Sequence, residues 1–243
     1  MSKFKEDFVY FTELIESGTP FAYARYADGE VGLMNGSEIN YASQAYQVDK
    51  WKSPAGITKV GTELLETLNH TEDNYYYAIS AHSDSVNDFN FLRSRIKTNN
   101  ITFANLWINS NYQSMKSFYM NLKRDVYLIC NHEANPSNFP FKIAEFFPFP
   151  DNCIEYWEMY GDDYISQLVE YTSQVNNQTF FVSTGPVSEI LIHRMYESNP
   201  NNQYIDVGSS IDEFVHGKMT RPYMNPNSQY ANDISEFKEW KLA

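Results

Sequence analysis

The chain has 243 residues, of which 42% are hydrophobic and 20% charged, proportions typical of a globular protein and unlike those of disordered, collagenous or coiled-coil chains. Lys and Arg number 18 against 31 Asp and Glu, and the net charge of −13 argues against a nucleic-acid-binding module because its average field repels a phosphate backbone. No apolar run approaches the roughly 18 residues of a membrane-spanning helix, and a polar N-terminus with two cysteines outside any zinc-site spacing leads us to expect a cytoplasmic protein.

The first half of the chain alternates between predicted helices and predicted strands. Hydrophobic spacing predicts helices over residues 4–15, 60–68, 86–96 and 112–122, and apolar runs predict strands over residues 21–27, 74–80, 101–107 and 125–130. Residues 35–57 show no clear period. We expect them to form a long loop with at most a short helix, of the kind that closes over a ligand.

The second half of the chain continues the alternation after an interruption rich in proline. Residues 136–150 contain four prolines and predict at most a short helix over residues 142–146. Further strands are predicted over residues 152–157, 179–183 and 204–207, with helices over residues 164–172 and 186–198. From residue 209 onward we expect an irregular tail, apart from a short helix over residues 234–240.

This alternation predicts the fold class. Strands that are nearly continuous apolar runs, each followed by a helix, favour a mostly parallel sheet covered by helices on both faces. We therefore expect a Rossmann-like α/β fold that forms a single domain over residues 1–243. Ligands of such folds bind at the carboxyl ends of the strands, so the residues that directly follow each strand are the candidates for a site.

The segment Arg25-Tyr-Ala-Asp28-Gly29-Glu30 follows the first predicted strand. Two carboxylates that flank a glycine offer oxygen ligands of the kind that Mg²⁺ and Mn²⁺ prefer, and Arg25 can bind a phosphate through two parallel hydrogen bonds. The alternative is an acidic surface turn in which Asp28 is merely the N-cap of a helix.

The segment Ser183-Thr184-Gly185-Pro186 leads from a predicted strand into a predicted helix. Free backbone N–H groups and the positive end of the helix dipole favour an anion there, so we expect Thr184, Gly185 and Pro186 to contact a phosphate. The alternative is ordinary capping of a helix that has proline in its first turn.

The last predicted strand carries Asp206 and ends at Gly208, where a ligand can approach the backbone closely. Asp212 and Glu213 follow as candidate general bases. Two basic residues after them are candidates to neutralise a diphosphate: Lys218 and Arg221. The alternative is a solvated turn near the C-terminus.

Histidines and aromatic residues give weaker signals. His82 follows the second predicted strand and is a further candidate base, whereas His70 and His193 fall on predicted helices and are interpreted as structural. Four aromatic side chains can stack on a base or a sugar, although their spacing does not select among them: Tyr23, Tyr26, Trp51 and Trp107.

Taken together, these segments resemble the GT-D type glycosyltransferases. The residues Arg25-Tyr-Ala-Asp28-Gly29-Glu30 are similar to the R-[FY]-G-D-G-E motif of that family, and Ser183-Thr-Gly185-Pro186, a helix and Tyr204-Ile-Asp206-Val-Gly208 resemble its later segment. The resemblance covers roughly residues 20–215. Two positions depart from the family pattern: Ala27 replaces the usual glycine, and Ser209 stands where many members have histidine.

The resemblance implies a metal-dependent transferase that moves a sugar from a nucleotide-diphosphate sugar, such as a UDP-sugar, to a glycan or glycoconjugate hydroxyl. It implies that Asp28 and Glu30 hold a divalent metal, Mn²⁺ or Mg²⁺, on the donor diphosphate. The residues themselves favour Asp212 as the base, followed by Glu213 and His82. Two alternatives remain open, a metal-dependent hydrolase or phosphotransferase and a non-catalytic nucleotide-binding module, as do the donor sugar, the acceptor and the oligomeric state.

Overall fold

The computed structural model describes residues 2–41, 51–80 and 86–231. At its centre lies a seven-stranded sheet in which every neighbouring pair of strands is parallel, with the order β5-β4-β1-β9-β8-β6-β7. Its strands are β1 (Phe21–Tyr26), β4 (Tyr75–Ile79), β5 (Ile101–Phe103), β6 (Val126–Asn131), β7 (Ile143–Phe149), β8 (Thr179–Ser183) and β9 (Gln203–Asp206). The predicted Rossmann-like α/β class is confirmed.

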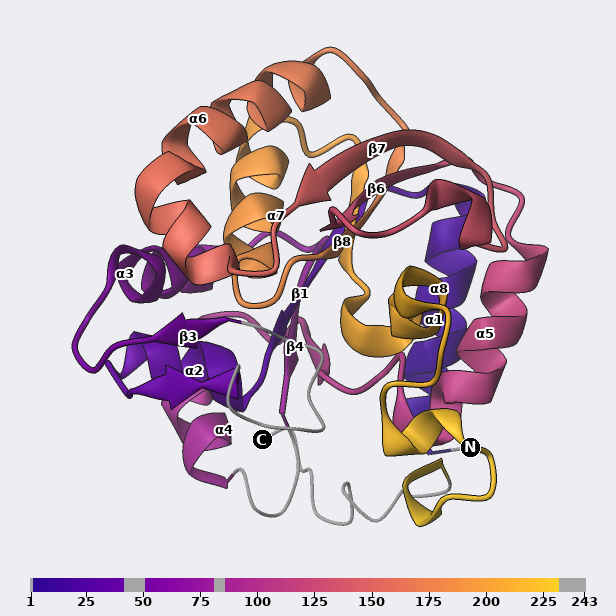
Figure 1. Cartoon of the computed structure of the whole chain (residues 1–243), viewed down its shortest axis with the longest axis horizontal. Helices are drawn as coiled ribbons and strands as arrows, with labels where there is room; N and C mark the ends of the chain where they lie inside the picture. The colour runs from indigo at the N-terminus through magenta and orange to yellow at the C-terminus, as the bar shows by residue number, and fades with distance from the viewer. Residues whose placement is uncertain (1, 42–50, 81–85, 232–243) are drawn as a thin grey trace.

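Helices cover both faces of the sheet (Figure 1). One face carries α1 (Lys3–Ser17), α5 (Tyr112–Asn121) and α8 (Asp212–His216). The opposite face carries α2 (Asp28–Met34), α3 (Lys59–Glu66), α4 (Val86–Arg93), α6 (Cys153–Ser173) and α7 (Ser188–Ser198). A small antiparallel pair, β2 (Ile39–Asn40) and β3 (Lys52–Ser53), stands apart from the main sheet.

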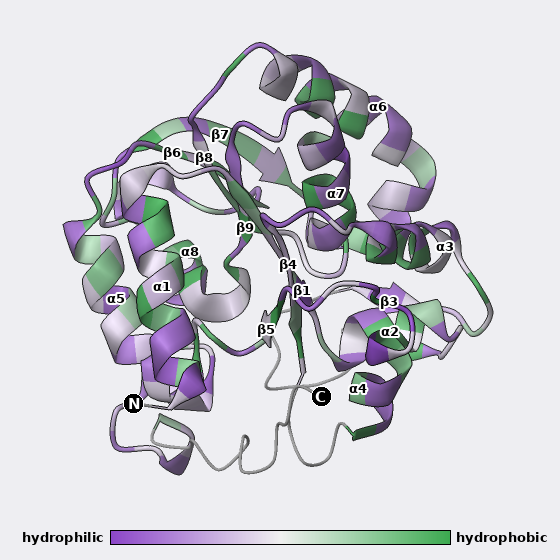
Figure 2. Ribbon diagram, turned by 180° about the vertical axis from the view of Figure 1, so that it is seen from behind, coloured by the Kyte–Doolittle hydropathy of each residue, from purple (hydrophilic) through white to green (hydrophobic). Residues whose placement is uncertain are grey.

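Strand β1 shows why the sequence folds in this way. Because successive side chains of a strand point to opposite faces, Ala22, Ala24 and Tyr26 pack on the side of α7, whereas Phe21 and Tyr23 pack on the side of α1. Both faces are buried, so the strand needs apolar residues at nearly every position. Hydrophobic residues accordingly concentrate on the central strands (Figure 2). Tyr23, Tyr26 and Trp107 belong to this core.

Two sequence predictions were wrong. Residues 142–146, predicted as at most a short helix, belong almost entirely to β7, which runs over residues 143–149. This strand lies at the edge of the sheet, where one side forms no hydrogen bonds to a neighbouring strand, so a proline such as Pro148 is tolerated. Residues 152–157, predicted as a strand, form the start of the 21-residue helix α6. Ile154 and Trp157 are both buried at helical spacing, which a window of six residues does not distinguish from a strand.

Some predictions differ from the structure in their bounds, and others lie outside the described residues. Helix α7 begins at Ser188, so Pro186 belongs to the preceding turn. The segment expected to be irregular from residue 209 holds the short helix α8. Residues 42–50 of the expected long loop, residue 82 and the helix expected at 234–240 lie outside the described residues. Within the described part of the chain, no helix combines the length and hydrophobicity needed to cross a membrane.

Candidate functional site

Strands β1, β9 and β8 are neighbours in the sheet although they lie far apart in the sequence. From β1 the chain builds outward through β4 and β5 on one side, and β6 to β9 fill the other side, so the direction of winding reverses here. A cavity of about 460 Å³ lies at this point, where ligands of open α/β sheets bind. The charged side chains in its wall are Arg25, Asp28, Glu30, Asp212 and Arg221.

The acidic turn after β1 brings both carboxylates to the cavity wall, one exposed and the other largely buried. Ala27 is the N-cap of α2 and Asp28 is the first helical residue, so Asp28 is not the N-cap of the alternative interpretation. Glu30 Oε2 accepts a hydrogen bond from the Ala27 N–H at 2.7 Å, which ties Glu30 to the start of the helix. Asp28 is exposed, and its Oδ2 accepts a hydrogen bond from the Tyr41 hydroxyl at 3.2 Å.

Arg25 stands in the middle of a buried group of acids that we call the Arg25 cluster: Arg25, Glu30, Glu189 and Asp206. Its Nε donates a hydrogen bond to Asp206 Oδ2 at 3.0 Å, and its backbone N–H donates one to Glu189 Oε1 at 3.3 Å. The guanidinium lies so close to Gly208 that a β-carbon there would be 2.4 Å from Arg25 Nη2. Gly208 is therefore required at the end of β9 because the arginine occupies the space of a side chain.

Three carboxyl groups surround one guanidinium in the Arg25 cluster, and this imbalance has measurable consequences. Burial raises the pKa of Glu30 to about 7, although Arg25 and the Ala27 N–H lower it. Burial, together with the charges of Asp206 and Glu30, raises the pKa of Glu189 well above its ordinary value. Glu189 is fully buried, and its Oε2 has no hydrogen-bond partner among the described residues.

The donor set of this wall fits a hard divalent cation. Asp28 raises the pKa of Glu30, so the two carboxyl groups are close enough to interact. Burial and Asp28 likewise raise the pKa of Asp88 on α4, so a further acid lies within electrostatic range. All of these ligand atoms are carboxylate oxygens, which Mg²⁺ and Mn²⁺ prefer. A bound cation would stabilise the charged forms of Glu30 and Asp88, which burial chiefly disfavours and the charge of Asp28 disfavours further.

Trp51 connects the two turns that the sequence singled out. A β-carbon at Gly29 would lie 3.4 Å from Trp51 Cη2, and one at Gly185 would lie 3.2 Å from Trp51 Nε1. The indole therefore spans the space between the acidic turn after β1 and the glycine turn after β8. The hydroxyl of Ser183 donates a hydrogen bond to the Gly208 carbonyl at 3.2 Å, which joins the ends of β8 and β9.

A second set of charges, which we call the α8 cluster, consists of Lys116, Asp212, Glu213 and Arg221, of which Asp212 and Arg221 line the cavity. Asp212 Oδ2 accepts hydrogen bonds from Arg221 Nε at 3.3 Å and from the Thr220 hydroxyl at 3.0 Å. The Glu213 carboxylate accepts hydrogen bonds from Lys116 Nζ at 2.8 Å and from the Tyr112 hydroxyl at 2.8 Å. Each acidic side chain of the α8 cluster thus forms an ion pair with a basic side chain of its own.

A smaller recess of about 70 Å³ adjoins the cavity. Four residues line both spaces: Trp51, Ser183, Gly185 and Asp212. Asp212 is the carboxylate common to both walls among the described residues. A group held in the recess and a ligand held in the cavity would therefore meet at Asp212.

The start of α7 differs from the predicted anion site. The Thr184 N–H donates a hydrogen bond to Ser188 Oγ at 3.0 Å, and the Ser188 N–H donates one to the Gly185 carbonyl at 3.0 Å. The first turn also carries the buried carboxyl of Glu189, which occupies the position at the positive end of the helix that an anionic ligand would favour. Gly185 and Pro186 line the cavity, whereas Thr184 lines the adjoining recess.

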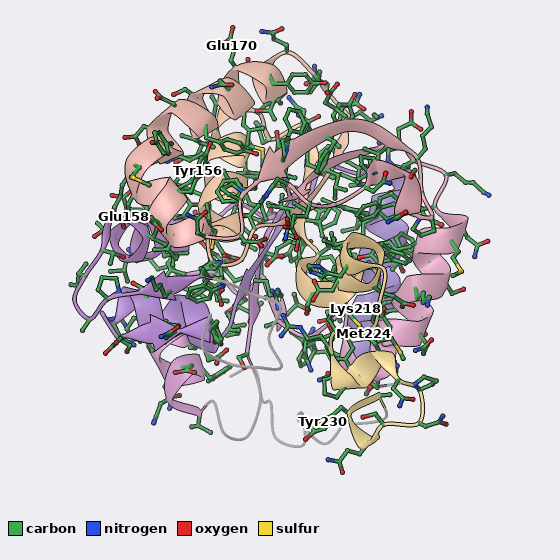
Figure 3. All side chains as sticks on the ribbon, in the orientation of Figure 1. Tyr156, Glu158, Glu170, Lys218, Met224 and Tyr230 are labelled. Carbon is green, nitrogen blue, oxygen red and sulfur yellow. The ribbon has the colours of Figure 1, made fainter. Side chains whose placement is uncertain are left out.

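The structure brings most of the predicted site residues together. Those that line the cavity are Arg25, Asp28, Glu30, Gly185, Pro186, Gly208, Asp212 and Arg221. Asp206 lies behind Arg25 and is buried. Glu213 and Lys218 are not part of the cavity wall, and Lys218 is exposed beyond the end of α8 (Figure 3). His82 lies outside the described residues.

Sequence reasoning missed Glu189 and left Trp51 undistinguished among the aromatic residues. A signal for Glu189 existed, because a lone carboxylate precedes the apolar run of residues 190–192 and therefore needs a buried partner. Nothing in the spacing of Trp51 indicates that it contacts both turns. A further group, His70, His193 and Glu197, brings three possible metal ligands within 4.8 Å of one another, and none of them lines the cavity.

Comparisons with known proteins bear on the fold. A parallel sheet with helices on both faces and a cavity at its switch point defines the chain as a Rossmann-like α/β protein. Two solved structures have the same fold: one of the domain of unknown function 1792, described as having a distinct glycosyltransferase fold, and a selenomethionine-substituted structure of domain of unknown function 1792. Each match covers 96% of this chain and 86% of the other, with a TM-score of 0.54 and 14% sequence identity.

At this level of identity the likeness concerns the fold, and the chain therefore has the glycosyltransferase fold found in that domain. The fold implied by the resemblance to the GT-D type glycosyltransferases is confirmed. No protein-family model matches the chain, and no curated protein does either.

Proposed function

We propose that this protein is a metal-dependent glycosyltransferase that uses a nucleotide-diphosphate sugar, with UDP-sugars as the first candidates, and a glycan or glycoconjugate hydroxyl as acceptor. The observation that carries the proposal is the meeting of three segments at one cavity: the Asp28-Gly29-Glu30 turn, the Gly185-Pro186 turn and Gly208 packed against Arg25. The glycosyltransferase fold of the matched structures supports the same activity.

Asp28 and Glu30 would hold the divalent cation, Mn²⁺ or Mg²⁺. When bound, that ion supplies a Lewis acid that neutralises charge on the donor diphosphate. The −13 charge of the chain makes such a local offset necessary, because a diphosphate is otherwise repelled.

Arg25 and Arg221 are the cationic side chains among the described residues of the cavity wall. Both are anchored by a carboxylate, Arg25 by Asp206 at 3.0 Å and Arg221 by Asp212 at 3.3 Å. An anchored guanidinium loses little conformational freedom when it binds an anion, so both are suited to hold the diphosphate and the negative charge that develops on it as the glycosidic bond breaks.

Asp212 is our candidate for the general base that accepts the proton of the acceptor hydroxyl. It lines both the cavity and the recess, so it would stand between donor and acceptor. Glu213 is less suited, because Lys116 and Tyr112 engage its carboxylate away from the cavity. Proton transfer to a positioned carboxylate contributes typically about 10²–10⁴-fold to such rates.

Calorimetry of UDP binding with and without Mn²⁺ tests the proposal. We expect UDP to bind in the presence of Mn²⁺ and Asp28→Asn to weaken that binding at least about tenfold, which is 1.4 kcal/mol. Asp162→Asn is the matched control, because Asp162 is an exposed acid that pairs with Lys59 on a different surface. If the affinity for UDP is the same with and without Mn²⁺ and the same in Asp28→Asn, the protein is instead a non-catalytic nucleotide-binding module.

Product analysis then separates the transferase from the hydrolase or phosphotransferase alternative. A panel of UDP-sugars is incubated with Mn²⁺, with and without glycan acceptors, and the products are resolved by mass spectrometry. A transferase forms a glycosylated acceptor at a rate that depends on acceptor concentration. Release of free sugar or sugar phosphate at the same rate without acceptor would contradict it.

A further inference from the structure

A chain of four titratable side chains lies outside the cavity, at the other end of α7. Glu72 Oε2 is 3.0 Å from His70 Nδ1, His70 Nε2 is 2.7 Å from His193 Nδ1, and His193 Nε2 is 3.4 Å from Glu197 Oε2. Both histidines are buried, and both carboxylates are about half exposed. A cavity of about 460 Å³ opens over all four.

The orientation of His70 is fixed by its surroundings. Its ring stacks on Tyr75 with 3.9 Å between the ring centroids, and Tyr196 meets it edge-on at 5.3 Å. Glu72 is held as well, because the Thr71 N–H donates a hydrogen bond to Glu72 Oε2 at 2.9 Å. The carboxylate and the first imidazole therefore form a rigid pair.

The hydrogen bonds along the chain define the arrangement in which His193 can bind a cation. The Glu72 carboxylate accepts, so His70 Nδ1 donates to it, and one proton lies in the short contact between His70 Nε2 and His193 Nδ1. When His193 Nδ1 is the donor in that contact, His193 presents a lone pair at Nε2. That lone pair faces the Glu197 carboxylate, so two electron-rich atoms confront each other at 3.4 Å.

The distance between the two outer groups fits this arrangement. The separation of His193 Nε2 and Glu197 Oε2 exceeds the usual 2.7–3.2 Å of an N–H···O hydrogen bond. It matches the distance of about 3.4 Å between two ligands placed about 2.1 Å from a tetrahedral ion.

We infer that His193 and Glu197 form a binding site for one late first-row divalent cation of the Zn²⁺ type, with His70 and Glu72 holding His193 in the tautomer that binds it. The two ligands stand one helical turn apart on α7, and the ring of the positioning residue His70 lies beside them, within 4.8 Å. A mixed nitrogen and oxygen donor set favours zinc-type ions over the Mg²⁺ and Mn²⁺ expected at the all-oxygen cavity wall.

The arrangement His193–His70–Glu72 is the outer hydrogen-bonded shell that metal-binding histidines usually have. One positive charge competes with the ion, because Arg194 Nη1 lies 3.9 Å from Glu197 Oε2 and Arg194 also contacts Glu66. Water would complete the coordination from the open side of the cavity.

The test is calorimetric titration of the full chain with Zn²⁺. We expect Glu197→Gln to weaken Zn²⁺ binding at least tenfold and His193→Gln to abolish it. Glu66→Gln is the matched control, because it removes an exposed carboxylate beside Arg194 without touching the cluster. Glu197 is half exposed, so its variant decides the question even where the buried His193→Gln fails to fold.

Two further variants locate the bound ion and test the positioning residues. Asp28→Asn removes a proposed metal ligand from the cavity at the strand ends. The Zn²⁺ binding that is lost in Glu197→Gln must persist in Asp28→Asn. Glu72→Gln is expected to weaken Zn²⁺ binding about tenfold while the Tm without metal stays unchanged. The inference is overturned if Glu197→Gln binds Zn²⁺ like the wild type, if Asp28→Asn abolishes all Zn²⁺ binding, or if millimolar Zn²⁺ does not bind.

Discussion

The two charged clusters that each contribute two side chains to the cavity wall are built on opposite principles. In the Arg25 cluster three carboxyl groups share one guanidinium, and both Glu30 and Glu189 have raised pKa values. In the α8 cluster every acidic side chain pairs with a basic side chain of its own. Burial alone would raise the pKa of Glu213, but the hydrogen bonds from Lys116 and Tyr112 lower it. The Arg25 cluster has fewer positive than negative groups, whereas the positive and negative charges of the α8 cluster are equal in number.

This difference indicates which cluster is suited to bind a cation and which needs none. Unbalanced buried carboxyl groups hold protons or bind metal ions, because isolated negative charges are costly in a protein interior. Balanced pairs hold their geometry without a ligand, which suits side chains that must be positioned before a substrate arrives. Substitutions in the two clusters test whether they differ in this way, beginning with the largest expected effect.

The two neighbouring acids of the α8 cluster give the largest contrast. We expect Asp212→Asn to lower kcat about 10²–10⁴-fold, because the variant lacks a proton acceptor between cavity and recess. Glu213→Gln is the matched control and should leave kcat within a few-fold of the wild type. Steady-state kinetics with the donor found by calorimetry measures both, and equal losses in the two variants would contradict the assignment.

Removing the space that Gly208 leaves for Arg25 should disrupt the Arg25 cluster. A β-carbon at Gly208 would lie 2.4 Å from Arg25 Nη2 on a backbone with φ of +45°. We expect Gly208→Ala to lower the free energy of unfolding by about 2–4 kcal/mol, as the sum of backbone and overpacking costs. Urea denaturation measures this difference.

Gly217→Ala provides the control for that substitution. Gly217 has a similar φ of +65°, but a β-carbon there would meet no heavy atom within 4 Å. Its cost should be limited to the backbone, about 1–2 kcal/mol. Equal destabilisation of the two variants would show that Arg25 is free to move away and that the cluster is not rigid.

The two clusters should respond to pH with opposite signs. Because the pKa of Glu189 is raised in the folded protein, the stability it confers is lost as pH rises above 4.5, the ordinary value of a glutamate. Glu189→Gln keeps an acceptor for the Arg25 N–H. Its free energy of unfolding should therefore increase relative to that of the wild type between about pH 5 and pH 8. Urea unfolding across this range is the measurement.

Glu213→Gln should behave in the reverse way. The lowered pKa of Glu213 stabilises the fold above pH 4.5, and this contribution is lost as pH falls through the lowered value. The variant should be about 1 kcal/mol less stable than the wild type at neutral pH, with the deficit vanishing in acid. Parallel pH profiles of the two variants would refute the contrast between the clusters.

The last prediction concerns the basic residues after α8. Arg221→Ala should weaken UDP binding in Mn²⁺ about tenfold, because it removes a charge-assisted hydrogen bond from the cavity wall. Lys218→Ala should leave the affinity unchanged, since Lys218 is exposed outside the wall. Calorimetry distinguishes them, and a comparable loss in Lys218→Ala would show that the wall extends beyond the described cavity.

Much of the fold could be predicted because its determinants are local. The parallel strands are buried on both faces, so each appears as an apolar run followed by a helical period, as at Phe21–Tyr26. The order of the strands in the sheet could not be predicted in this way. The edge strand β7 was missed because its free side tolerates the proline that would exclude a central strand.

The site was predictable to the extent that it follows from strand ends. Asp28, Gly185 and Gly208 all lie just after strands that turned out to be neighbours, so one rule placed all three. The partners of Arg25 were not predictable, because Glu189 comes from a different element and its burial depends on tertiary packing. Asp212 and Glu213 are adjacent in the chain, and only their different ion-pair partners, Arg221 and Lys116, distinguish the roles of the two acids.

Trp51 gives this molecule an internal optical reporter. Its indole lies against Gly29 and Gly185 and lines both the cavity and the recess, so a nucleotide that enters must change the polarity around the ring. The fluorescence emission of this tryptophan should therefore shift on loading without any added dye. Of the other tryptophans in the described part of the chain, Trp107 and Trp157 are both buried in the interior and contribute emission that a ligand in the cavity does not change.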